Sequence, residues 1–297
     1  MEQDIAGQGT GRLRRVIAFP LTLLVIGAAM VVAALVIVSL GMNLLPIESN
    51  SPMSALRGLA AGLAGIAAYA AFMRWVERAP NLEFAAAGAG RELALGLLTG
   101  CGLMLLSAGL VALLGGFRIE GVLGTGNFWT MLAIALYSGP IEEILFRGLA
   151  LRLLEKLIGT IWALAITSAF FGLAHLTNPD SSYFAAFAIA MEAGILLGAA
   201  YLLTRRLWLA IGIHSAWNFT QGWVLSIPVS GTGASDGLLM TRREGSDWLT
   251  GGAFGLEASV VTLFVATAAG LLMLRRAWLN GMWGNRAIAE AADQTKL

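Results

Sequence analysis

Long apolar stretches separated by short polar segments run through most of the chain. Each stretch comes close to the ~20 apolar residues that an α-helix needs to cross a bilayer. The pattern therefore predicts an all-α, polytopic membrane protein with about eight transmembrane helices. These spans are expected near residues 16–40, 55–73, 93–115, 127–150, 160–177, 183–203, 207–228 and 253–274.

The first apolar stretch follows a polar, arginine-containing start, so it also resembles a secretory signal peptide. The apolar core of a signal peptide has only about 7–15 residues, whereas this stretch runs from Val16 to Leu40. We therefore expect an anchor helix, with a cleaved signal as the alternative. Residues 79–92 are expected to form an interfacial elbow between two spans.

The polar segments divide the chain into successive parts. They are a cytoplasmic N-terminal tail at 1–15, N-terminal transmembrane helices at 16–124, a core at 125–228, an exposed loop at 229–252, and the last transmembrane helix with a cytoplasmic tail at 253–297. Cytoplasmic loops carry an excess of Lys and Arg. If the N-terminus is inside, 15 of the 19 Lys and Arg residues lie inside as well. The other four, Arg57, Arg118, Arg242 and Arg243, lie outside. Both termini are thus expected in the cytoplasm.

Composition narrows the class of protein further. Hydrophobic residues make up 58% of the chain and charged residues 12%, whereas soluble domains carry about 25% charged residues. The net charge of +1 says little about nucleic acid in a chain built for a bilayer, but no basic tract stands out, and we expect no nucleic-acid partner. The single cysteine, Cys101, excludes an intrachain disulfide and a CxxC motif. We expect a multi-pass protein of the cell (inner or plasma) membrane, with the lipid bilayer as its surroundings.

Two adjacent acids and an arginine interrupt the fourth apolar stretch. Glu143 and Arg147 are four residues apart with the acid first, the favourable order for an ion pair within a helix. Glu142 is left without a local counter-charge. Pro140, two residues earlier, is expected to kink the helix because it lacks an N–H group. Ionised side chains are costly in hydrocarbon, so this run predicts a functional site.

Both histidines of the chain also lie in apolar stretches. His175 falls in the fifth span and His214 in the seventh, with Asn218 one turn beyond His214 on the same helix face. Glu192 is a further acid in the middle of the sixth span. It is expected to pair with Arg147, to accept from a hydroxyl, or to lie in a water-filled cavity.

These residue types suit a hydrolytic centre. Glu142 is a candidate general base, an imidazole can orient the attacking water, and His214 with Asn218 can donate to an oxyanion. A divalent metal such as zinc is the alternative, since His175, His214 and Glu142 make a familiar set of catalytic zinc ligands. The chain lacks an HExxH motif, so spacing alone leaves both mechanisms open.

The three motifs resemble those of a known family of intramembrane proteases. The family is that of the CAAX prenyl endopeptidases and bacteriocin-processing (Abi, or CPBP) proteins, and the similarity covers roughly residues 125–220. The motifs are Glu142-Glu143-x-x-x-Arg147, Phe171-x-x-x-His175 and His214-x-x-x-Asn218. The core at 125–228 is thereby identified as similar to a CAAX-protease catalytic core.

The resemblance implies a role for each motif residue. Glu142 would activate water together with His175, while His214 and Asn218 would stabilise the oxyanion. The remaining acid and arginine of the first motif would support that arrangement. Members of the family are often labelled metalloproteases, and a metal-free glutamate mechanism is also proposed for them.

The expected function is cleavage of a membrane-associated peptide or protein, as in CAAX-box protein processing. One alternative is a non-catalytic membrane protein, such as an immunity or scaffold protein, in which the acids and histidines only support packing. The other is an ion-coupled transporter with Glu142 and Glu192 as its ion sites.

Overall fold

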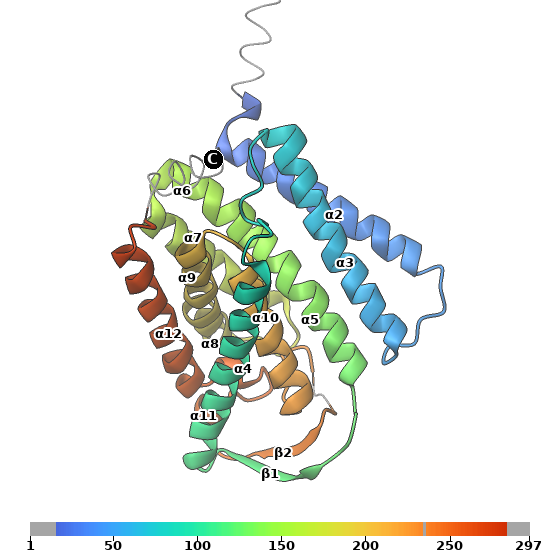
Figure 1. Cartoon of the computed structure of the whole chain (residues 1–297). Coiled ribbons are helices and arrows are strands. Elements are labelled where there is room, and N and C mark those ends of the chain that lie inside the picture. Colours follow the sequence, from blue (N-terminus) through green and yellow to red (C-terminus); the bar gives the residue numbers. More distant parts are fainter. Residues whose placement is uncertain (1–15, 234–235, 284–297) are drawn as a thin grey trace, which may run out of the picture.

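The computed structural model describes residues 16–233 and 236–283, and most of this part is helical (Figure 1). The predicted tail at 1–15 and the last residues of the predicted C-terminal tail lie outside it. The α-helices are α2 (Pro20–Met42), α3 (Pro52–Ala71), α4 (Ala89–Leu113), α5 (Phe128–Glu143), α6 (Arg152–Ile158), α7 (Thr160–Ala174), α8 (Tyr183–Ile189), α9 (Ile195–Thr204), α10 (Trp208–Phe219), α11 (Asp247–Thr250) and α12 (Val260–Leu279).

Four segments wind more loosely, as π-helix, and continue an α-helix. They are η1 (Phe72–Glu77), η2 (Ile144–Leu151), η4 (Ala190–Gly194) and η5 (Thr220–Val224). Two short 3-10 segments, η3 (His175–Thr177) and η6 (Leu256–Ala258), precede or follow loops. Single π-helical turns inside α-helices are frequent at functional sites, and η2 and η4 both adjoin the site described below.

Six helical stretches in the described part are long and apolar enough to cross a membrane. They are Pro20–Met42, Pro52–Glu77, Ala89–Leu113, Thr160–Thr177, Tyr183–Thr204 and Val260–Leu279. These helices make the chain a multi-pass membrane protein. The other two predicted spans are also helical, as α5–η2–α6 and α10–η5, but the first carries many charges and the second is short. The count of eight and the cytoplasmic termini stay predictions.

The region after residue 228 differs from its prediction. The last helix begins at Val260 rather than near 253, and residues 229–252 contain a strand and a short helix instead of a loop alone. Strand β2 (Leu239–Arg243) pairs antiparallel with β1 (Phe117–Val122). Sequence signals for strand pairing are local turn signals. They are absent here because the two strands lie more than a hundred residues apart in the chain.

The predicted elbow at 79–92 ends earlier than expected, because α4 already begins at Ala89. Its loop is fixed to the start of α10. The backbone N–H of Leu207 donates to the Glu83 carbonyl at 3.0 Å, and the Trp208 indole donates to the Ala85 carbonyl at 3.1 Å. The elbow therefore holds the beginning of the helix that carries His214.

Helix α10 lies unusually close to α4 because glycines meet at their contact. A Cβ atom added to Gly96 would lie 2.9 Å from the Cα of Gly212, and one added to Gly212 would lie 2.9 Å from the Cα of Gly96. Small residues allow this backbone approach between membrane helices. The position of α10 therefore depends on these two residues.

Replacing Gly96 by alanine should push α4 and α10 apart and reduce stability by about 1–3 kcal/mol, the usual cost of overpacking a well-packed contact. Thermal unfolding of the purified protein in detergent measures the change. Gly102→Ala is the matched control, since a Cβ atom there meets nothing within 4 Å and alanine favours the helix. An equal effect of the two substitutions would contradict the close-contact argument.

Candidate functional site

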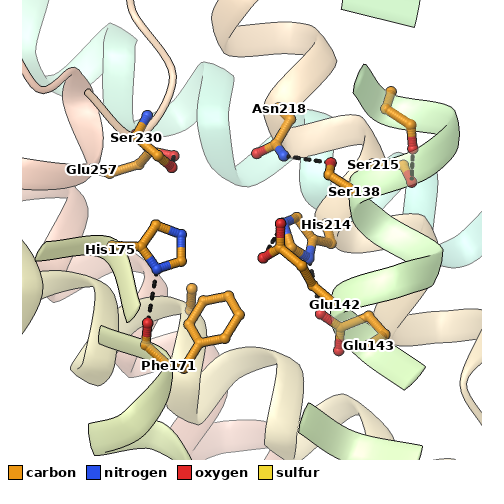
Figure 2. Close-up of polar contacts among 12 residues, drawn as sticks. Ser138, Glu142, Glu143, Phe171, His175, His214, Ser215, Asn218, Ser230 and Glu257 are labelled. Carbon is orange, nitrogen blue, oxygen red and sulfur yellow. Dashed lines mark hydrogen bonds and ion pairs between the residues drawn. The ribbon is translucent and has the colours of Figure 1, made fainter. Parts of the chain in front are cut away.

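The two acids of α5 and the histidine of α10 lie side by side (Figure 2). The Nδ1 atom of His214 is 2.8 Å from Oε1 of Glu143, and its Nε2 atom is 3.8 Å from Oε2 of Glu142. Nδ1–H donates to Glu143, because a carboxylate only accepts. Each nitrogen of this ring therefore faces a different carboxylate, and Nε2 points toward Glu142.

The two adjacent acids differ in surroundings. The Glu143 side chain has an exposed fraction of 0% and that of Glu142 has 31%. The Glu142 side chain is therefore partly open to its surroundings, whereas that of Glu143 is enclosed by protein. This difference suits Glu142 to chemistry with water and Glu143 to holding the ring of His214.

Arg147 balances the buried charge of Glu143. Its guanidinium lies 3.0 Å from the Glu143 carboxylate, the spacing expected for the ion pair four residues apart. It also donates to the carbonyls of Ala193 at 2.9 Å and Gly194 at 3.3 Å. The arginine, in η2, thereby joins α5 to η4. The charges of Glu143 and Arg147 therefore balance each other, as a buried ion pair requires, whereas Oε2 of Glu143 accepts no hydrogen bond.

His175 lies across the site from Glu142 and His214 (Figure 2). It ends α7, and its Nδ1 is 2.7 Å from the carbonyl oxygen of Phe171. Nδ1 must be the donor in this bond, because the carbonyl can only accept. In the neutral ring Nε2 is then an acceptor. No hydrogen bond joins His175 to Glu142 within the described residues, so their joint activation of water stays a prediction.

Asn218 is held by a residue that the sequence analysis did not identify. Its Nδ2 group donates to the hydroxyl of Ser138 at 3.1 Å. Ser138 lies one helical turn before Glu142 on α5, so the spacing of four residues could have indicated it. Ser215 donates to the Ala135 carbonyl at 2.7 Å and fixes α10 against α5 in the turn before Pro140.

A cavity lies between the two histidines and Asn218. It offers about 30 Å³ to the centres of water molecules, and one water needs roughly 10–15 Å³ by this measure. Its polar lining consists of His175, Glu192, His214, Asn218, Ser230 and Glu257. Of the three expectations for Glu192, the cavity is correct. The carboxylate forms no ion pair with Arg147 and receives no hydrogen bond.

Glu257 was not identified from the sequence. It lies in η6, before α12, and burial raises the pKa of its carboxyl, although hydrogen bonds from Ser230 and Gln221 act in the opposite direction. The chain reaches this position after a long loop, so no helical spacing connects Glu257 with the motifs.

The arrangement of side chains gives the metal alternative no support. Within residues 16–233 and 236–283, no three or more His, Cys, Asp or Glu residues lie together as a metal site. The Nδ1 atoms of His175 and His214 are both engaged, one by a backbone carbonyl and the other by Glu143, which leaves Nε2 as the second nitrogen of each ring. The predicted zinc set of His175, His214 and Glu142 is not assembled, and no step below uses a metal.

Comparison with known proteins supports the motif interpretation. Neither a curated protein nor a solved structure matches the chain. A family model does match, over the segment that runs from just before α5 to the first residue of η5 and contains all three motifs. Residues 124–220 match the family of type II CAAX prenyl endopeptidases described as Rce1-like, and the resemblance expected from the motifs is confirmed.

Proposed function

We propose that the chain is an intramembrane endopeptidase that hydrolyses a peptide bond of a membrane-associated protein or peptide. The observation that carries the proposal is the placement of a partly exposed Glu142 carboxylate 3.8 Å from His214, beside a cavity lined by His175 and Asn218. The Rce1-like family is a protease family, and six membrane helices fit a membrane-associated substrate. The proposal includes eight crossings, with both termini in the cytoplasm of a cell-membrane protein.

Glu142 acts as general base in this scheme. A water molecule held between Glu142 and Nε2 of His175 gives one proton to the Glu142 carboxylate as its oxygen attacks the peptide carbonyl. The carbon–oxygen double bond opens to an oxyanion. Glu142 then returns the proton to the leaving nitrogen as the carbon–nitrogen bond breaks. The first products are a carboxylic acid and an amine, and transfer of the acid's proton to the amine leaves a carboxylate and an ammonium group, so atoms and charges balance.

His214 and Asn218 stabilise the oxyanion in this scheme. Asn218 uses one amide hydrogen for Ser138 and keeps the second for the substrate. The protonated ring of His214 donates through Nε2, since Nδ1–H is already directed to Glu143. Such fixed donors stabilise charge that develops only in the transition state.

Asn218→Ala should lower the rate of cleavage by about 100-fold, the usual effect of removing one oxyanion donor. The KM should change little, because the lost hydrogen bond forms only in the transition state. The assay uses protein in proteoliposomes and a fluorogenic prenylated peptide that ends in a CAAX box. Asn43→Ala, at an exposed loop position, is the control. An unchanged rate would remove Asn218 from the mechanism.

The function itself is tested without choosing a substrate. Membranes from cells with and without the protein are compared for new protein termini by mass spectrometry. Termini that appear only with the active protein are the expected result. A non-catalytic immunity or scaffold protein would produce none.

A further inference from the structure

One side of the cavity is acidic, and the mechanism above does not use it. Glu192 and Glu257 line the same cavity as His175, His214 and Asn218. Both side chains are almost fully buried, with exposed fractions of 1% and 2%. Charged groups are rarely buried unless they are paired. These two acids therefore need an explanation.

Glu192 has no partner at all in the described structure. It lies in the π-helical turn η4, and neither carboxylate oxygen receives a hydrogen bond. A buried polar group without a partner is costly, and a carboxylate more than most. Its place in the cavity lining means that a ligand entering the cavity can reach it.

Glu257, in contrast, is held in one position by three donors. Its oxygens accept from the Ser230 backbone N–H at 2.7 Å, from the Ser230 hydroxyl at 3.0 Å and from the Gln221 amide at 2.8 Å. Ser230 adopts a left-handed φ of 49°, which is unfavourable for a residue with a side chain. In this strained conformation, both the backbone N–H and the hydroxyl of Ser230 donate to Glu257.

No arginine or lysine in the described residues forms an ion pair with either acid. Arg147, the arginine buried at the site, is already engaged by Glu143 and two carbonyl groups. The basic groups that line the cavity with Glu257 are the two histidines, His175 and His214. A cavity with two acids and no fixed cation attracts a positive charge from outside. An ammonium group is about as large as a water molecule, and the cavity has room for water.

We propose that Glu192 and Glu257 form a subsite for a basic side chain, lysine or arginine, of the peptide substrate. This inference rests on the proposed protease function and adds a specificity to it. The basic side chain would enter the cavity beside His175, so the cleaved bond would lie close to a lysine or arginine. Glu257 is outside the segment that matches the family, so this preference would belong to this chain's own loop.

The test measures binding rather than cleavage. Protein with Glu142→Gln, which should not turn over substrate, is placed in lipid nanodiscs. Dansyl-labelled apolar peptides with one lysine at successive positions are compared with twins that carry norleucine there. At one or two positions the lysine peptide should bind at least about tenfold more tightly, as expected for a desolvated charge pair.

Glu192→Gln and Glu257→Gln, each added separately, should bring the two affinities close together. Glu192→Gln is the milder change, because that carboxylate makes no hydrogen bond. Glu120→Gln, on the exposed strand β1, is the control and should keep the preference. The subsite would be overturned if the Glu142→Gln protein bound both peptides equally or bound neither. It would also be overturned if the preference for lysine survived both added substitutions.

Cleavage of the same peptides by the unaltered protein separates this inference from the function on which it rests. Cleavage that requires Glu142 but shows no preference for lysine would leave the protease proposal standing and remove the subsite. A binding preference for lysine without any cleavage would leave the subsite standing and remove the protease proposal.

Discussion

Glu142→Gln is expected to reduce peptide-bond cleavage by about 10²–10⁴-fold, the range for loss of a general base. Glutamine has the same size as glutamate but cannot take a proton from water. The carboxylate of Glu142 is partly exposed, and its nearest charged contact, His214, lies at 3.8 Å. The fold should therefore tolerate the change. Termini produced in cells and the rate in proteoliposomes are the two measurements.

The neighbouring acid gives a useful comparison. Glu143→Gln keeps the size but removes the charge that holds His214 and Arg147, so it should impair stability as well as rate. Glu142→Gln should impair rate alone. If Glu142→Gln left the set of new termini unchanged, the hydrolase proposal would fail. Glu120→Gln serves as a control at an exposed position.

Arg147→Leu is expected to lower stability by about 3–5 kcal/mol, because removing one member of a buried ion pair leaves the other charge without a partner. Glu143 would keep only the His214 ring, and the carbonyls of Ala193 and Gly194 would lose their donor. The midpoint of thermal unfolding in detergent should fall strongly, and activity should be lost with it.

Arg118→Leu is the matched control for this loss. Arg118 also pairs with an acid, Glu244 at 3.7 Å, but its side chain is 67% exposed. Exposed pairs contribute about 0–1 kcal/mol, so its removal should change the unfolding midpoint little. If the two substitutions lowered the unfolding midpoint by similar amounts, burial of the Glu143–Arg147 pair would not determine how much that pair contributes to stability.

The sequence predicted the features that depend on local spacing. Apolar runs of sufficient length identified the membrane helices, and the spacing of four residues identified the pair of Glu143 with Arg147. The family resemblance rested on three motifs. Residues of the second and third line one cavity, and the two acids of the first lie beside that cavity through their contacts with His214.

The features that were missed depend on contacts between distant parts of the chain. Strand β1 pairs with β2 across more than a hundred residues of intervening chain, and Glu257 reaches the cavity through a loop. Looser π-helical turns such as η2 leave no clear signal in hydropathy, because they change the winding rather than the polarity. The zinc alternative was plausible from residue types, but the described residues do not gather three such ligands at one place.

The pairing of β1 with β2 has a consequence for dissecting the protein. The two strands come from opposite sides of the segment that the family model matches, and they join the chain before α5 to the chain after η5. Helix α4, also upstream, forms the glycine contact that seats α10. The block that the family model recognises is therefore not a module that can be excised and transplanted. Segments on both sides of it, β1 and α4 before and β2 after, make the contacts that hold its helices in place.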